Sequence, residues 1–299
     1  MDRIVRKKLH SPEKAMMLVW PYVLLSLQLF FSSCQNASSP HPPAPSNSEQ
    51  TLILDNGNTP ATRFEAPAGY KRIKVDSTSF GHYLRNLPLF PSGSVVKYYN
   101  GETKQNRQVY AAVVNLPIGK RDLHQCADAV MRLRADYLRH QKKSNEIQFH
   151  FTNGFNAAYS RWMSGERIQV NGNDCRWISN GPSGDSDTEY WKYLEMVFNY
   201  AGTLSLSKEL VSREWDKMEI GDILIKGGSP GHAVIVVDMV ENDLTHEKMY
   251  MLAQSYMPAQ EIQILLNPET NTVWYSLSAE DPIETPEWTF TRAQLKRFS

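Results

Sequence analysis

Four short apolar segments in the last third of the chain limit the folds that it can adopt. Each segment has the length of one strand, and only short connections separate them, which favours antiparallel pairing. They cover residues 220–225, 233–240, 249–253 and 262–266. Three further segments of the same character precede them, at residues 95–99, 111–116 and 147–151. The sequence therefore predicts a mainly antiparallel sheet.

Helical patterns accompany these strands. Apolar side chains recur at helical spacing over residues 123–140, and similar patterns cover 187–201 and 289–298. No internal repeat and no second linker interrupts residues 51–299, so we expect a single α+β domain with its helices packed on one side of the sheet. A stretch rich in Gly, Asn and Ser predicts an inserted loop region near 160–186.

The first 50 residues have the composition of a targeting segment and a linker. Basic residues precede an apolar run from about residue 15 to 31, which is the order found in secretory signal peptides. The small residues that follow end at Cys34 and resemble the lipobox of bacterial lipoproteins, which implies that Cys34 carries a lipid. We predict a lipoprotein signal peptide at residues 1–33 and a Pro/Ser-rich tether at 34–50, which cannot pack a core.

This N-terminus predicts a protein of the bacterial cell envelope. The lipid would anchor it to a membrane, either on the periplasmic side or at the cell surface. An uncleaved membrane helix and ordinary secretion are the alternatives, although a membrane helix requires about 20 apolar residues. The run here is shorter and contains Pro21 and Gln28.

Charge and cysteine content exclude several functional classes. The chain has 32 basic and 32 acidic side chains, so it lacks the excess of positive charge that is typical of nucleic-acid-binding proteins. Three cysteines are too few for a fold stapled by disulfides. His, Cys, Asp and Glu do not recur at spacings typical of zinc sites, so we expect neither a metal nor a cofactor.

Cys126 lies near the start of the helix predicted over 123–140. Asp122 as N-cap and Gln125 three positions later form a capping-box pattern, which places Cys126 in the first turn on the apolar stripe. Free backbone N–H groups and the positive helix end favour a thiolate there, as nucleophilic catalysis requires. Position alone leaves two alternatives open, which are a buried packing residue and a disulfide with Cys175.

A Gly-Ser-Pro-Gly turn leads directly to His232, which opens the apolar strand at 233–240. A strand of this kind is buried on both faces, so we expect His232 at the accessible end of the strand, where solvent and substrate reach it. Gly231 permits the close approach of a ligand backbone. A histidine that merely finishes the turn is the alternative.

These features together resemble the NlpC-type and CHAP-type papain-like cell-wall peptidases. The shared pattern is a cysteine at a helix start, then Gly-Asp-Ile, then Gly-His opening an apolar strand. The resemblance implies a papain-like core in which Cys126 is the nucleophile, His232 is its base, and a polar residue on the next strand orients the imidazole. The long span from Cys126 to His232 then requires an insertion.

Gln254 is the predicted third residue. If the strand near 249–253 forms a hairpin with the strand that begins at His232, even-numbered residues share one face and Gln254 lies within cross-strand reach of His232. Its side-chain oxygen then accepts from one imidazole N–H and fixes the tautomer.

Longer blocks of the chain are similar to an uncharacterised family of bacterial lipoproteins, a domain of unknown function. The similarity extends over most of the folded part but implies no activity, because the family has none assigned. The matching blocks are residues 87–94, 125–138, 201–206, 227–238 and 252–262.

The sequence therefore predicts a lipid-anchored thiol hydrolase, a cysteine peptidase or amidase, that cleaves an amide bond. The resemblance implies peptidoglycan peptides as substrate, with a cell-wall peptide or glycan and the membrane as partners. Aromatic side chains can also stack on sugar rings. The predicted site residues are Cys126, His232 and Gln254 for catalysis and Gly231 and Trp177 for substrate binding. A non-catalytic envelope lipoprotein of papain-like fold, binding glycan or a protein partner, is the alternative, and acyl transfer is a third hypothesis.

Overall fold

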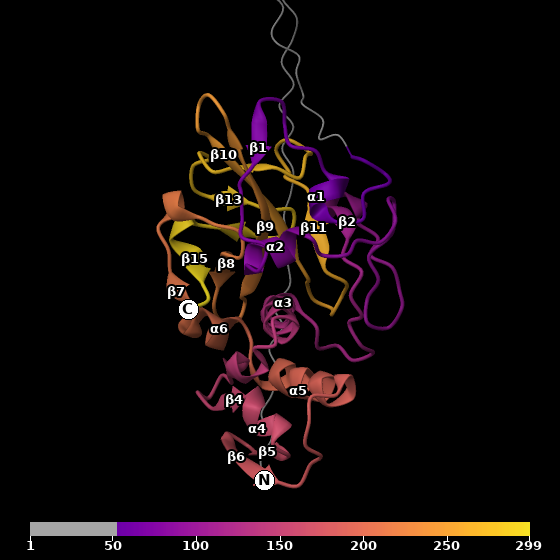
Figure 1. The fold of residues 1–299 in the computed structure, drawn as a ribbon, viewed down its shortest axis with the longest axis vertical. Coiled ribbons are helices and arrows are strands. Elements are labelled where there is room, and N and C mark those ends of the chain that lie inside the picture. The colour runs from indigo at the N-terminus through magenta and orange to yellow at the C-terminus, as the bar shows by residue number, and fades with distance from the viewer. Residues whose placement is uncertain (1–52) are drawn as a thin grey trace, which may run out of the picture. The chain divides into compact units, whose positions relative to one another are not determined.

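The computed structural model describes residues 53–299, which build an antiparallel sheet and the helices against it (Figure 1). The predicted signal peptide at 1–33, the tether at 34–50 and the lipid-carrying Cys34 lie outside the described residues. Among the residues that are described, no helix has both the length and the apolar character needed to cross a bilayer.

The central strand of the sheet is β9 (His232–Asn242), the longest in the described chain. It lies between β10 (Lys248–Gln254) and β8 (Ile223–Lys226), and the sheet order is β2-β11-β10-β9-β8-β15-β7. All of these pairings are antiparallel. The outer strands are β2 (Tyr110–Val113), β11 (Gln263–Leu265), β15 (Leu295–Arg297) and β7 (Val211–Ser212). Two short strands pair alongside, β1 (Tyr70–Arg72) with β9 and β12 (Tyr275–Ser276) with β10.

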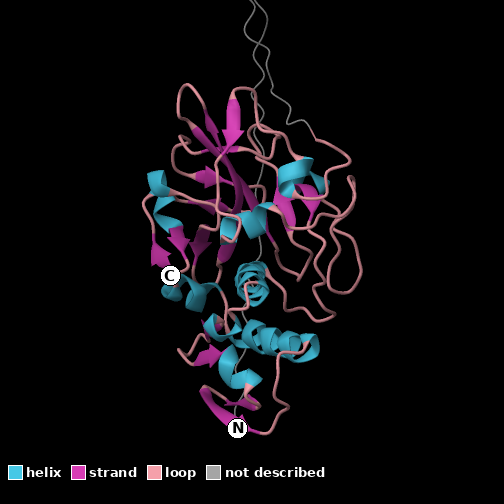
Figure 2. Cartoon of the chain, in the orientation of Figure 1, coloured by secondary structure: helices cyan, strands magenta, loops and turns pink. Residues whose placement is uncertain are grey.

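The helices gather on one side of this sheet (Figure 2). Buried apolar side chains of α2 to α6 belong to one core, which packs against a single face of β9 and β10. The helices are α1 (Pro60–Arg63), α2 (Phe80–Arg85), α3 (Cys126–His140), α4 (Tyr159–Met163), α5 (Asp187–Tyr200) and α6 (Thr203–Glu209). A second core on the other face includes side chains from the hairpin of β13 (Ile283–Glu284) and β14 (Thr289–Phe290).

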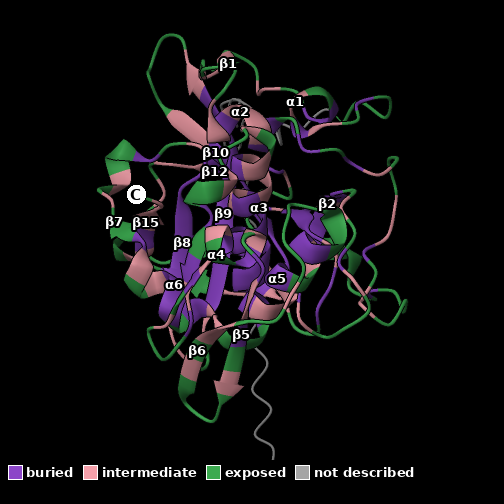
Figure 3. Ribbon diagram, turned by 60° about the horizontal axis from the view of Figure 1, so that its bottom comes forward, coloured by how far each residue is buried: buried purple, intermediate pink, exposed green. Residues whose placement is uncertain are grey.

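Alternation along β9 explains why both faces of the sheet are covered. Ala233, Ile235 and Val237 contribute to the core with the helices, whereas Val234 and Val236 contribute to the opposite core. The strand is buried from His232 to Val240, as the purple ribbon of Figure 3 shows. A strand buried on both faces has a continuous apolar sequence, and this is the pattern that residues 233–240 display.

Three of the predicted elements are wrong. Residues 95–99 form no strand and contribute only isolated bridges, such as Lys97 with Thr103. The helix predicted over 289–298 is instead β14, a 3-10 turn at Arg292–Gln294 and β15, because Leu295 pairs with Leu224 of β8.

The third error concerns the inserted region near 160–186, which is more ordered than the expected loop. It contains most of α4 and a hairpin of β5 (Glu166–Asn171) and β6 (Asp174–Ser179). A smaller hairpin, β3 (Gln148–His150) with β4 (Asn156–Ala158), precedes it. The Gly and Asn residues that predicted a loop stand at the turns of this region.

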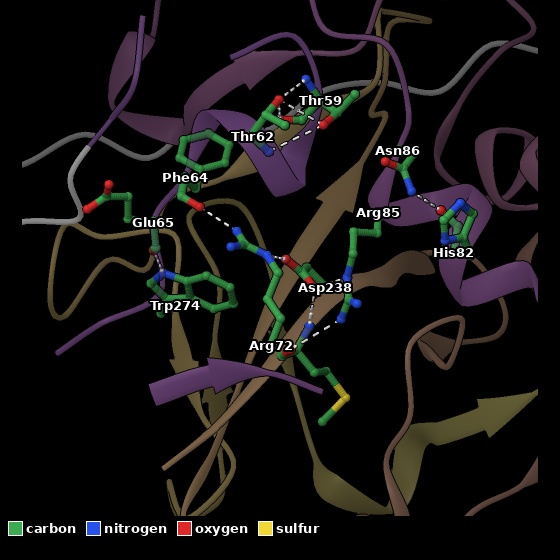
Figure 4. Close-up of polar contacts among 11 residues, drawn as sticks. Thr59, Thr62, Phe64, Glu65, Arg72, His82, Arg85, Asn86, Asp238 and Trp274 are labelled. Carbon is green, nitrogen blue, oxygen red and sulfur yellow. Dashed lines mark hydrogen bonds and ion pairs between the residues drawn. The ribbon is translucent and has the colours of Figure 1, made fainter. Parts of the chain in front are cut away.

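Asp238 on β9 joins the first described segments of the chain to the sheet. Its carboxylate accepts from Arg72 Nε of β1 at 2.8 Å and from Arg85 Nε of α2 at 2.6 Å (Figure 4). Arg72 also donates to the carbonyl of Phe64, the residue after α1. The side chain of Asp238 is fully buried, so these two arginines neutralise its charge in place of solvent, and the Met239 backbone N–H also donates to it at 2.8 Å.

Removal of this carboxylate is expected to be costly. Asp238→Asn leaves two arginines without their acceptor charge, and breaking a buried ion pair in this way costs about 3 kcal/mol or more of unfolding free energy. Urea denaturation measures the change. Asp243→Asn is the matched control, because the Asp243–Lys71 pair is largely exposed, and such pairs contribute about 0–1 kcal/mol. Equal losses in the two variants would contradict the prediction.

Candidate active site

Cys126 is the first residue of α3, with Gln125 as the N-cap. The helix starts there because Asp128, at the third helical position, accepts the Gln125 backbone N–H at 2.9 Å. The predicted capping by Asp122 is wrong by three residues. Asp122 Oδ1 instead accepts from the Ala259 N–H at 2.7 Å and from Gln125 Nε2 at 3.1 Å, and so ties the helix start to the loop after β10.

The Cys126 thiol lies in a buried position and is 7% exposed. Burial raises the pKa of Cys126 to about 11, and the nearby charge of Asp128 acts in the same direction. Hydrogen bonding to the backbone N–H groups of Ala127 and Ala233 opposes this shift. Because Ala233 follows His232, the thiol lies against the start of β9. Cys126 and Cys175 are both free, so the structure contains no disulfide between them.

His232 begins β9, as predicted, but it is 1% exposed and therefore does not stand open to solvent. Three aromatic rings surround the imidazole, with centroid distances of 4.8 Å to Tyr256, 5.4 Å to Trp288 and 5.9 Å to Phe290. This burial lowers the pKa of His232 to about 4, because the charged imidazolium is poorly solvated there. The ring is therefore neutral at physiological pH.

Gln254, the last residue of β10, contacts His232 as the hairpin pattern predicts. The distance from Gln254 Oε1 to His232 Nε2 is 2.8 Å, and the amide nitrogen of Gln254 donates to Glu287 Oε2 at 2.6 Å. Because the amide oxygen faces the ring, His232 Nε2 is the nitrogen that carries the proton. Nδ1 then has the free lone pair and is the basic nitrogen of the ring.

Tyr256 lies close to both Cys126 and His232. Its ring meets the imidazole edge to face, and its pKa is raised by burial, by Glu287 and by the charge of the Cys126 thiolate. Within residues 53–299, the imidazole makes its side-chain hydrogen bond to Gln254, and none joins it to the Cys126 thiol. The thiol and the imidazole are thus near each other at the start of β9 but are not hydrogen-bonded.

A cavity of about 410 Å³ opens beside the thiol. Gly231, a predicted substrate-binding residue, lines it, whereas His232 does not form part of its wall. Exposed apolar side chains of Leu204 and Met257 also contribute to the wall. The other lining residues are Asp122, Leu123, Gln125, Cys126, Ala127, Asp128, Thr152, Phe198, Ala201, Gly202, Thr203, Gly228, Ser229 and Pro230. The cavity therefore offers a mixed polar and apolar surface next to Cys126.

Trp177, the other predicted binding residue, is not brought to this cavity. It lies on β6, where its ring packs against Phe155 at 5.8 Å and beneath the Arg161 guanidinium at 4.9 Å.

Among residues 53–299, no group of three or more His, Cys, Asp or Glu side chains is arranged to hold a metal ion.

Two groups in the site have no counterpart in the sequence prediction. Glu287, between β13 and β14, bonds to Gln254 and forms an ion pair with Lys104 at 2.6 Å. Asp128 is 6% exposed, and its Oδ1 atom has no hydrogen-bond partner. Burial raises the pKa of Asp128 to about 8. The position of Asp128 in the first turn of the helix, near a candidate nucleophile, is a signal for Asp128, whereas no local pattern indicates Glu287.

Comparison with known proteins places the chain in a family without assigning it a chemistry. Residues 61–297 match the family model described as a domain of unknown function, DUF4846. No curated protein and no solved structure matches the chain. The match covers almost all of the described residues, including Cys126, His232 and Gln254. The chain therefore belongs to the DUF4846 family.

Proposed function

We propose that this protein is a thiol hydrolase that cleaves an amide bond, with Cys126 as nucleophile, His232 as base and Gln254 as the residue that orients the imidazole. One observation carries the proposal. The 2.8 Å contact between His232 Nε2 and Gln254 Oε1 sets the ring tautomer immediately beside a cysteine at a helix start. A nucleophile, a base and an orienting group in this order are the elements of a catalytic triad.

The proposed reaction has two steps. Cys126 Sγ attacks the carbonyl carbon of the amide while His232 Nδ1 takes the thiol proton, and the resulting imidazolium protonates the departing amine. A thioester links the acyl group to Cys126. Water then attacks the thioester with His232 again as base, which releases the carboxylic acid and restores the thiol. The backbone N–H of Cys126, at the start of α3, is a donor for the oxyanion.

The protonation states favour a neutral pair over a preformed ion pair. Burial raises the pKa of the thiol and lowers that of the imidazole, so both groups are uncharged at pH 7. The proton consequently transfers during the attack on the substrate, as in a general-base mechanism. His232 is the base only when it is unprotonated, and the reaction rate is expected to fall as the pH drops toward 4.

The proposed substrate is a peptide of the cell wall, and the proposed location is the cell envelope with a lipid on Cys34. Support for both comes from the N-terminal pattern and from the resemblance to papain-like cell-wall peptidases. The cavity of about 410 Å³ beside Cys126 has room for several atoms of a substrate, and its wall combines acidic, amide and apolar groups suited to a peptide.

A non-catalytic binding protein is the second candidate. The observation that favours it is the absence, within residues 53–299, of a hydrogen bond between the Cys126 thiol and the His232 ring. In this case Cys126 is a packing residue, and the cavity binds a glycan or a protein partner without cleaving it.

Alkylation by iodoacetamide separates these candidates. At pH 7 we expect Cys126 of the wild-type protein to react about 100-fold faster than Cys126 of His232→Ala, because general-base assistance contributes at least that much. Mass spectrometry after digestion resolves Cys126 from Cys175, which serves as the internal control in every sample. His232→Gln is a second variant, and near-ultraviolet circular dichroism verifies the fold of both. Identical rates in the wild type and in both variants would exclude the hydrolase.

A further inference from the structure

The hydrogen bonds of Gln254 extend to Glu287, which is not one of the three predicted catalytic residues. We propose that Glu287 is a positioning residue that holds the Gln254 amide in a single orientation and thereby keeps the proton of His232 on Nε2. The significance of this assignment rests on the proposed function, because the tautomer decides which ring nitrogen acts as base.

The hydrogen bonds run in one direction, donor to acceptor, from the ring through Gln254 to Glu287. Gln254 Nε2 donates to Glu287 Oε2 at 2.6 Å, and Gln254 Oε1 lies 2.8 Å from His232 Nε2. A carboxylate only accepts hydrogen bonds, so a flipped Gln254 would set its oxygen against the oxygen of Glu287. The same flip would present the amide nitrogen to His232 and move the ring proton to Nδ1. Glu287 therefore excludes the flipped amide by charge.

Lys104 holds this carboxylate in place through an ion pair. Its ammonium group is buried and lies 2.6 Å from Glu287 Oε2 and 3.1 Å from Gln260 Oε1. Burial lowers the pKa of Lys104, while the hydrogen bond and the charge of Glu287 oppose that shift. Gln263 Nε2 also donates to Gln260 Oε1 at 3.0 Å, so the support extends onto β11. Lys104 and Gln254 thus donate to the same carboxylate oxygen of Glu287, Oε2.

Aromatic side chains cover Lys104 and the His232 ring, while the Glu287 side chain is 20% exposed. Tyr256 covers Lys104 at 5.9 Å and meets the His232 ring, and Trp288 packs on the imidazole from the hairpin that carries Glu287. Hydrogen bonds in such surroundings are stronger than in water, and unpaired polar atoms are correspondingly costly. The orientation of Gln254 is therefore set by its partners and not by exchange with solvent.

Substitution of Glu287 by glutamine tests the assignment directly. The new amide can donate to Gln254 Oε1, so the barrier to the flipped orientation disappears while size and shape are retained. Long-range ¹H–¹⁵N NMR of protein labelled at histidine nitrogen reports which ring nitrogen is protonated, and His232→Gln identifies the signal of His232. We expect the wild-type ring to carry its proton on Nε2 and the Nδ1–H fraction to rise at least about tenfold in Glu287→Gln, as expected for loss of a hydrogen bond to a charged group.

Glu287→Leu is a second variant, and it is expected to change the tautomer in the same direction because it also lacks the acceptor. Glu284→Gln is the matched control, since Glu284 lies in the same hairpin but accepts from Thr289 at 2.7 Å, whereas the Gln254 side chain bonds to His232 and Glu287. Retention of the Nε2 proton in whichever Glu287 variant folds would overturn the assignment.

The tautomer readout is independent of catalysis, so failures of the two proposals are distinguishable. Suppose that the tautomer changes in Glu287→Gln while Cys126 of His232→Ala is alkylated at the wild-type rate. This result would support the role of Glu287 and count against the hydrolase. An unchanged tautomer in Glu287→Gln together with slow alkylation in His232→Ala would support the hydrolase and remove Glu287 from the assignment.

Discussion

Amide hydrolysis is expected to fall by at least about 10³-fold when Cys126 is replaced by alanine. In the proposed reaction the Sγ atom forms the acyl bond, and removal of the nucleophile from such an enzyme leaves only the contribution of binding and the oxyanion donors. The fold is expected to persist, because Cys126 is a small side chain at a helix start and alanine is a good helix former. The measurement is mass spectrometry of soluble peptidoglycan peptides incubated with the full chain, which detects a new amine and a new carboxylate.

Two further variants complete this experiment. Cys175→Ala is the control for loss of a thiol, since Cys175 lies on β6 and its sulfur accepts from Asn153 at 3.2 Å. It should retain full activity. Gln254→Leu should lower the rate less than Cys126→Ala, because it disturbs the orientation of the base and leaves the nucleophile in place. Hydrolysis that survives in Cys126→Ala would exclude every mechanism in which this thiol acts.

The residues of the candidate site differ in how far the sequence can predict them. Cys126, His232 and Gln254 are predicted because each depends on a local pattern. These patterns are a helix start, the first residue of an apolar strand, and the parity of a hairpin. The structure brings His232 and Gln254 into contact despite a register shift between Met251 and Leu252, which the sequence did not indicate. Their catalytic roles remain a proposal.

Other parts of the site depend on contacts between distant segments, which no local pattern encodes. Lys104 and Glu287 are separated by more than half of the described chain and meet only because both reach the end of β10. The burial of His232 has the same origin, since Trp288 and Phe290 come from a hairpin far along the sequence. Trp177 is predicted because aromatic side chains around the Gly- and Ser-rich stretch can stack on sugar rings, and the structure places it on the separate β5–β6 hairpin.

The mistaken helix at 289–298 shows how pairing overrides periodicity. Leu295 and Phe298 are three positions apart, as on one face of an amphipathic helix, but Phe290 and Leu295 reach the core from β14 and β15 with a 3-10 turn between them. The decisive contact is between Leu295 and Leu224 of β8, a strand about 70 residues earlier. Short apolar segments satisfy helical and extended patterns equally well, and tertiary pairing selects between them.

Asp128→Asn is expected to stabilise the protein, and by an amount that grows with pH. Burial raises the pKa of Asp128 to about 8, well above the value of a carboxyl group in an unfolded chain, although its hydrogen bond from Gln125 opposes the shift. Between about pH 4 and pH 8 the folded protein therefore binds this proton more tightly than the unfolded chain does. Stability is consequently lost as the pH rises through that window. Asparagine has no titratable proton in this pH range, and its side-chain oxygen can still accept the Gln125 N–H.

The expected gain is close to zero at pH 4 and increases by about 1.4 kcal/mol per pH unit, to about 5 kcal/mol at pH 8. Urea denaturation at pH 4.5, 6, 7 and 8 measures it. Burial also lowers the pKa of His124 to about 3 and that of His232 to about 4, which makes both proteins less stable as the pH falls below about 6.5. Because the two histidines are common to the wild type and the variant, their effect cancels in the difference.

Asp216→Asn is the control for this comparison, since Asp216 is largely exposed and should give a difference that does not vary with pH. Parallel stability curves for wild type and Asp128→Asn would mean that Asp128 is ionised in the folded protein. A charge would then stand two residues from the Cys126 thiol and oppose formation of the thiolate. A difference that grows with pH means instead that Asp128 stays neutral up to about pH 8, so that Cys126, His232 and Asp128 are all uncharged before a substrate enters the cavity.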